Sequence, residues 1–293
     1  MKAAAFEYAR PAHLDEACAL LAAEEDARLI AGGQTLVPLM AMRLARPRLL
    51  VDIARIPDLA FVRAGGNAIA IGATTRQCVV ERDPIVRAKL PLLAKVMPFV
   101  GHASTRARGT VGGSLANGDS AAEIVLVAVT LGATLSYREG SGSADVAASD
   151  FFVGPMTTTL PQAGCLTSVR FPAWHEKRIG VGFHEVSARQ SDFAFVAAAA
   201  QIVLDEDGRC RRLAAGVGAA TPVPIRLDTQ ALVGTRITEA AARDVVAAAL
   251  ANTEPLSDLH ASAGYRRRVA LSLAVRAIMD AHQAAEARGA HAG

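Results

Sequence analysis

The chain has 293 residues, of which 52% are hydrophobic and 20% are charged, so it can bury a sizeable core and lacks the composition of a disordered protein. Its 31 Lys and Arg against 28 Asp and Glu leave a net charge of +3, too small and too dispersed to predict a nucleic-acid or anionic-membrane surface. At roughly 100–200 residues per domain, this length favours two domains.

No membrane span and no secretory signal are predicted. The longest apolar runs, residues 124–135 and 193–200, fall short of the ~18–20 residues that cross a bilayer. Glu7 and Arg10 stand where a signal peptide would have its apolar core. The protein is therefore expected to be soluble and cytoplasmic. The one tight basic run, 266–268, is interpreted as a solvated helix face.

The four cysteines are far apart in the sequence and form no Cys-x-x-Cys pair. This spacing supports neither a zinc site nor a local set of iron–sulfur ligands. They are interpreted as buried free thiols.

The first part of the chain alternates short strands and helices. Apolar residues at helical spacing predict a helix over 14–21, and a short strand follows over 28–31. A second helix is expected from about 35 to 44, with Thr35 as its cap, and then a strand over 49–53.

A hairpin comes next, because predicted strands at 61–63 and 68–71 flank the turn Ala-Gly-Gly-Asn. Helices are predicted over 75–82 and 85–96. The segment 109–117 is rich in Gly, Ser and Thr and precedes an apolar run.

The region 144–170 is rich in turns, with strands expected near Leu135 and Leu166. A change of composition at 172–178 marks a domain boundary near residue 175. Beyond it, strands are predicted at 181–186, 195–204 and 213–218 and helices at 239–251 and 265–286.

Two segments share one construction. Residues 31–36 (AGGQTL) and 110–117 (TVGGSLAN) each pair two glycines with a hydroxyl residue and lead into helix-forming sequence. Glycines let backbone N–H groups turn toward one anion, and a following helix start adds favourable partial charge. Two such segments could clasp a pyrophosphate.

Neither has the spacing of a P-loop or a Rossmann fingerprint, so both of those sites are disfavoured. The alternative, that both are ordinary tight turns, stays open on the residues alone.

Further motifs occur in order along nearly the whole chain: FEYARP at 6–11, AGGQTLVPLM at 31–40, LVDI at 50–53, IGATT at 71–75, RARGTVGGS at 106–114 and EVSARQSDFA at 185–194. With these motifs the chain resembles the FAD-binding medium subunit of the molybdenum hydroxylases, the family of xanthine dehydrogenase and carbon monoxide dehydrogenase.

The resemblance implies an α+β fold. A two-subdomain FAD-binding domain of the vanillyl-alcohol-oxidase (PCMH) type would cover residues 1–175, with subdomains at about 1–55 and 56–175. A small C-terminal α+β domain, an antiparallel sheet with helices as in the carbon monoxide dehydrogenase flavoprotein, would cover 176–287.

The resemblance also implies the FAD site. The two glycine segments would hold the pyrophosphate and ribityl chain. Glu123 would contact the sugar-alcohol region, although a solvated helix charge is the alternative. Leu166 would touch the isoalloxazine, with simple core packing as the alternative role. Phe193 would lie near the same ring. The predicted cofactor-binding set is Ala31, Gly32, Gly33, Gln34, Thr35, Leu36, His102, Thr110, Gly112, Gly113, Ser114, Asn117, Glu123, Leu166 and Phe193.

No catalytic or metal-ligating residue is predicted, and His102 and His184 are interpreted as structural rather than catalytic. Glu185 stands where carbon monoxide dehydrogenase-like sequences have Lys. This departure puts in doubt that a positive group lies over the flavin from this position. The apolar stretch 96–102 is hypothesised to lie near the flavin and partly at a partner interface, with interior packing as the alternative.

The partners follow from the same resemblance. Substrate would be oxidised at a molybdopterin centre in a large subunit, and electrons would cross two-iron clusters in a small subunit to the FAD of this chain. A dimer of heterotrimers is one assembly that this allows.

The substrate is expected to be an N-heterocycle or aromatic compound. The electron acceptor is left open: it could be NAD, a quinone or another carrier. Two alternatives remain: a stand-alone flavin-dependent oxidoreductase of the same cofactor fold, and a cofactor-free scaffold.

Overall fold

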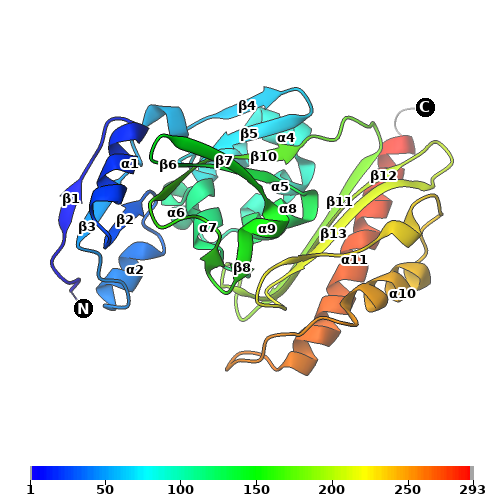
Figure 1. Cartoon of the computed structure of the whole chain (residues 1–293). Helices are drawn as coiled ribbons and strands as arrows, with labels where there is room; N and C mark the ends of the chain where they lie inside the picture. The colour runs from blue at the N-terminus through cyan, green and yellow to red at the C-terminus, as the bar shows by residue number, and fades with distance from the viewer. Residues whose placement is uncertain (1, 291–293) are drawn as a thin grey trace.

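The computed structural model describes residues 2–290 and begins with a small parallel sheet (blue in Figure 1). Strands β1 (Glu7–Ala9), β2 (Ala27–Ile30) and β3 (Leu49–Asp52) are arranged in the order β1-β3-β2. Parallel neighbours need crossover connections, which α1 (Leu14–Ala23) and α2 (Leu36–Ala41) supply here.

The predicted helix over 35–44 is too long. α2 ends at Ala41, and Arg43 has a left-handed φ of 61°. Thr35 occupies the N-cap position, but its side chain makes no capping hydrogen bond.

The second sheet is antiparallel, in the order β4-β5-β10-β6-β7. The predicted hairpin is confirmed as its first pair. The strands are β4 (Val62–Gly65), β5 (Ala68–Gly72), β6 (Thr134–Glu139), β7 (Gly142–Ala147) and β10 (Gly164–Pro172). Beside it lie α9 (Ala148–Phe151) and the small pair β8 (Phe152–Gly154) and β9 (Thr157–Thr158).

Six helices fill the connection between β5 and β6: α3 (Gln77–Arg82), α4 (Pro84–Lys89), α5 (Pro91–Val96), α6 (Ala103–Arg108), α7 (Val111–Asn117) and α8 (Glu123–Leu131). The single helix predicted over 85–96 is thus two helices. The break falls where Pro91, which has no backbone N–H to donate, starts α5.

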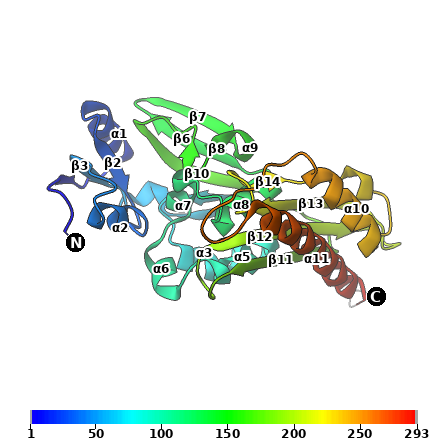
Figure 2. The same cartoon turned by 90° about the horizontal axis from the view of Figure 1, so that it is seen from below.

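The third sheet is antiparallel, in the order β11-β12-β13-β14, and the long helix α11 lies along it (Figures 1 and 2). Its elements are β11 (Ile179–Ser187), β12 (Ala194–Leu204), β13 (Cys210–Gly218), β14 (Ile225–Arg226), α10 (Glu239–Leu250) and α11 (Ala263–Ala290). No helix among residues 2–290 is both long and apolar enough to span a bilayer.

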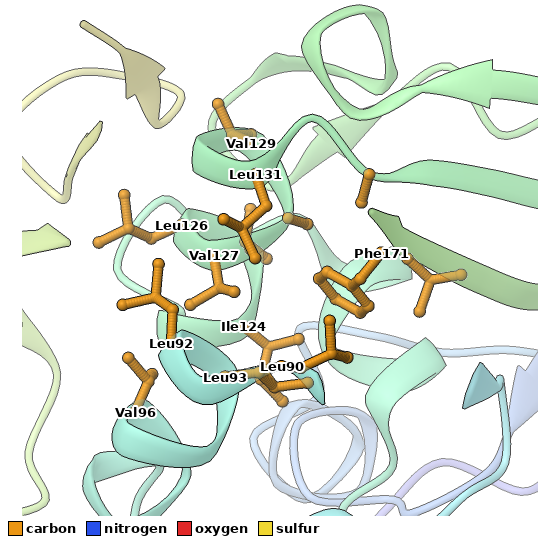
Figure 3. Packing of buried hydrophobic residues seen from close by; sticks show 14 of the residues in the cluster. Leu90, Leu92, Leu93, Val96, Ile124, Leu126, Val127, Val129, Leu131 and Phe171 are labelled. Carbon is orange, nitrogen blue, oxygen red and sulfur yellow. The ribbon is translucent and has the colours of Figure 1, made fainter. Parts of the chain in front are cut away.

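The largest core is built around α5 and α8 (Figure 3). α8 is apolar all round, and its residues from Ile124 to Leu131 are buried, as expected for a helix surrounded by protein. The same core continues into the third sheet through Ile179 and Phe183 of β11 and Ala197 of β12. The third sheet therefore packs on α5 and α8 with one face and on α11 with the other.

The basic run 266–268 is not wholly a solvated face, so that interpretation is wrong for Arg266. This side chain is 4% exposed, bonds the carbonyl oxygens of Phe195 and Ala219, and pairs with Asp258 at 2.6 Å. The four cysteines are free thiols, and Cys18, Cys165 and Cys210 are buried.

Candidate functional site

A cavity of about 860 Å³ runs between the N-terminal sheet and the second sheet. Its wall is formed by the segment after β2, by α6 and α7, by the start of α8, and by parts of β10 and the loop after β11. All fifteen predicted positions line it: Ala31, Gly32, Gly33, Gln34, Thr35, Leu36, His102, Thr110, Gly112, Gly113, Ser114, Asn117, Glu123, Leu166 and Phe193.

The first glycine segment presents unused donors. Within the described residues, the backbone N–H groups of residues 32–35 donate no hydrogen bond. Gly33 has a left-handed φ of 70°, and the side-chain amide of Gln34 donates to the Gly32 carbonyl oxygen at 3.1 Å. Successive free N–H groups around such a turn form a concave site for an anion. This geometry supports the expectation that the segment binds a phosphate group.

The second segment is built differently, because its glycines lie in the first turn of α7. The Val111 N–H donates to the Thr75 carbonyl oxygen at 3.1 Å and the Gly112 N–H to the Ala73 carbonyl oxygen at 2.8 Å. The Gly113 N–H donates to Thr110 Oγ1 at 3.0 Å. The expectation that this segment also turns free N–H groups toward an anion is therefore wrong.

Close packing explains the glycines instead. A Cβ at Gly112 would lie 2.4 Å from the Ala73 side chain. A Cβ at Gly32 would lie 2.5 Å from the Arg108 carbonyl oxygen and 2.8 Å from the Gly109 Cα. The first segment thus lies against the residues directly before the second one, although about eighty residues separate them in the sequence. A larger residue at Gly32 would push these two parts of the chain apart.

Gln77 is a cavity residue that sequence reasoning missed. It is 6% exposed, lines the cavity, and donates its N–H to the Gly109 carbonyl oxygen at 2.9 Å. Its Oε1 is buried and accepts no hydrogen bond from the described residues. Because buried acceptors are rarely left without a donor, this oxygen fits a donor on a bound ligand. No sequence signal distinguishes it from any other polar residue at a helix start.

The remaining predicted residues give the cavity wall both apolar and ionisable groups. Leu166 is buried at 3%, whereas Phe193 is 74% exposed. His102 is exposed at the N-cap position of α6. Within the stretch 96–102, residues 100–102 line the cavity, and the Phe99 ring packs edge-on against the Phe183 ring with 4.8 Å between the ring centroids.

Glu123 is not a solvated helix charge. Burial, with repulsion from Glu185 and Asp119, raises its pKa from near 4.5 to about 8. The side chain therefore carries a proton on the cavity wall at neutral pH.

This shift predicts a pH-dependent stability. Because the folded pKa of about 8 lies above the unfolded value near 4.5, the folded chain binds more protons between these values, and stability falls as pH rises through them. Glu123→Gln removes this contribution. Between pH 5 and pH 8 the free energy of unfolding of wild type should therefore fall relative to that of Glu123→Gln. We expect the difference to reach several kcal/mol, at about 1.4 kcal/mol per pH unit. Urea unfolding at both pH values measures the difference, and the exposed residue Glu254 supplies the control variant Glu254→Gln. Parallel pH profiles for wild type and Glu123→Gln would contradict the prediction.

Two families account for most of the chain. Residues 4–174 match the FAD binding domain in molybdopterin dehydrogenase, and residues 182–281 match the CO dehydrogenase flavoprotein C-terminal domain. The chain is 34% identical to the nicotine 6-hydroxylase medium subunit of Paenarthrobacter nicotinovorans over 96% of this chain and 99% of that one. It is also 34% identical to the carbon monoxide dehydrogenase medium chain of Afipia carboxidovorans, over 93% and 95%.

Solved structures agree. Carbon monoxide dehydrogenase from Hydrogenophaga pseudoflava superposes with a TM-score of 0.93 at 31% identity, covering 97% of this chain and 99% of that one. Quinoline 2-oxidoreductase from Pseudomonas putida 86 gives 0.92 at 36% identity with the same coverage. These matches confirm the α+β fold with an FAD-binding domain and a C-terminal domain, the FAD cofactor, and the role as an oxidoreductase subunit. The chain belongs to the family of FAD-binding medium subunits of the molybdenum hydroxylases.

Proposed function

We propose that this chain carries electrons within a heterotrimeric molybdenum hydroxylase. FAD in the cavity would accept electrons from iron–sulfur clusters of a small subunit and pass them to an external acceptor. The large subunit would hydroxylate an N-heterocyclic or aromatic substrate. Relatives named nicotine 6-hydroxylase and caffeine dehydrogenase support this substrate class.

The free N–H groups of residues 32–35 are the observation that carries the proposal. Four successive donors on the wall of a cavity of about 860 Å³ suit a pyrophosphate within a dinucleotide-sized ligand. Thr110, Ser114 and Asn117 add hydroxyl and amide groups to the cavity wall. Leu166 and Phe193 offer the apolar surface that an isoalloxazine ring would contact.

When bound, FAD supplies the redox chemistry, and the chain binds, orients and shields it. The boundary near residue 175, the dimer of heterotrimers and the cytoplasmic location stay predictions. β10 ends at Pro172 and β11 begins at Ile179, which is compatible with that boundary.

The test is purification of the complex from its native host with flavin, molybdenum and iron analysis. We expect one FAD on this chain and molybdenum and iron in two copurifying chains. A yellow chain that turns over substrate alone, without metals or partners, would instead identify a stand-alone flavin oxidoreductase. A chain that takes up no FAD, even with its partners, would contradict FAD binding itself.

Gln77→Leu is expected to weaken FAD binding about tenfold or more, because a buried ligand donor would lose its acceptor at a cost of ~1–3 kcal/mol. Fluorescence titration of the FAD-free chain measures the affinity. Leucine keeps the volume of the side chain, so equal thermal melting of both FAD-free proteins would show that the fold is retained. Unchanged affinity would show that Oε1 faces no ligand donor.

A further inference from the structure

A second pocket, of about 490 Å³, lies at the carboxyl edge of the N-terminal parallel sheet. β2 ends at Ile30 and its parallel neighbour β3 ends at Asp52, and both residues line this pocket. Open parallel sheets bind their ligands beyond this edge of the strands. Residues 30–34 line both the second pocket and the first cavity, but several polar residues line the second pocket alone: Tyr8, Asp52, Arg55, Arg76 and Arg108.

Arginines from three separate segments bring positive charge to the second pocket. Arg55 follows β3, Arg76 occupies the N-cap position of α3, and Arg108 is the last residue of α6. A β-bridge joins Arg76 to Thr110, and Arg76 Nη1 donates a hydrogen bond to the Arg108 carbonyl oxygen. That oxygen belongs to a neutral peptide group, so this bond orients the Arg76 side chain and leaves its charge without a counterion.

The charge of these arginines is not neutralised by the protein. Within residues 2–290, the guanidinium groups of Arg55 and Arg108 donate no hydrogen bond and form no ion pair of 4.0 Å or less. The carboxylate of the pocket, Asp52, accepts hydrogen bonds from the Tyr8 hydroxyl at 2.5 Å and the Ala54 N–H at 2.9 Å instead. Three arginines against one aspartate leave the lining of the pocket with a net charge of +2.

We propose that the second pocket binds a small phosphate ester, whose phosphate group pairs with Arg55, Arg76 and Arg108. Guanidinium groups match the oxygens of a phosphate in shape and charge. A phosphate monoester carries about −1.5 to −2 charges at pH 7, which complements the lining. The volume of the pocket falls in the range of roughly 300–1,000 Å³ of small-molecule sites, so an organic group fits beside the phosphate. Tyr8 and Val37, both about half exposed, offer apolar surface for that group. The proposal concerns a second ligand and does not depend on FAD binding.

Calorimetric titration of the full chain with AMP at pH 7 tests the site, in excess FAD so that the first cavity is filled. We expect one AMP per chain, and at least tenfold weaker binding of adenosine, which lacks the phosphate. Arg55→Gln and Arg108→Gln should each weaken AMP binding about tenfold, because each removes a charge-assisted hydrogen bond. The matched control is Arg82→Gln, at an exposed arginine of α3 that lines neither pocket; it should bind AMP like wild type.

Three results would overturn the proposal: no AMP binding at millimolar concentration, equal affinity for AMP and adenosine, or wild-type AMP affinity in both Arg55→Gln and Arg108→Gln. Thermal melting of the variants checks the fold, which should be retained because both side chains are exposed. Flavin fluorescence measured beforehand detects failure of the proposed function, in which the chain takes up no FAD. The same titration without FAD would then decide, since neither arginine lines the first cavity.

Discussion

Gly182→Ala is expected to lower the free energy of unfolding by on the order of 3 kcal/mol or more, because overpacking against rigid backbone is among the costlier core substitutions. A Cβ at this position would lie 2.0 Å from the Ala277 carbonyl oxygen of α11. Backbone at that distance cannot yield without moving the helix off the sheet. Urea unfolding of wild type and variant measures the loss.

Gly65→Ala is the matched control, because Gly65 lies in β4 and an added Cβ would meet no atom within 4 Å. Its stability should stay within about 1 kcal/mol of wild type. Gly180→Ala offers a second trial of the same contact, since its Cβ would lie 1.8 Å from the Ala281 carbonyl oxygen. If both β11 variants unfold like wild type, α11 is not held at this distance.

Gly32→Ala is expected to reduce FAD affinity by about a hundredfold or more, equivalent to ~3 kcal/mol. The new Cβ would lie 2.5 Å from the Arg108 carbonyl oxygen, so the first glycine segment would have to move away from the segment before α7. That movement would displace the free N–H groups of residues 32–35, which we propose bind the pyrophosphate. The measurement is FAD affinity by fluorescence quenching, together with thermal melting of the FAD-free protein.

Gly264→Ala is the control for that experiment, because its Cβ would lie 3.7 Å from the nearest side-chain atom, in α11 and outside the cavity wall. It should bind FAD like wild type. A Gly32→Ala protein with wild-type affinity and melting temperature would show that the contact between the two segments is not needed for binding.

Much of the local structure could be predicted because its causes are local. Alternating apolar residues and the turn Ala-Gly-Gly-Asn predict the hairpin of β4 and β5, which the structure confirms. The glycine segments identified the cavity wall, since glycine pairs next to hydroxyl residues mark sites where backbone comes close to a ligand or to other backbone. Helix ends were less predictable, as the early end of α2 and the break at Pro91 show.

The sequence by itself carried the motifs that resemble the family, with the cofactor that this resemblance implies, and it marked the segments that line the cavity, because such motifs are residue types in a fixed order along the chain. Only the tertiary structure decided what each group does there. It assigned the N–H groups of α7 to internal partners, left Gln77 Oε1 buried without a donor, and buried much of the Glu123 side chain at the cavity wall. Those outcomes depend on contacts between residues tens of positions apart, and a contact of that kind has no local pattern from which it can be predicted.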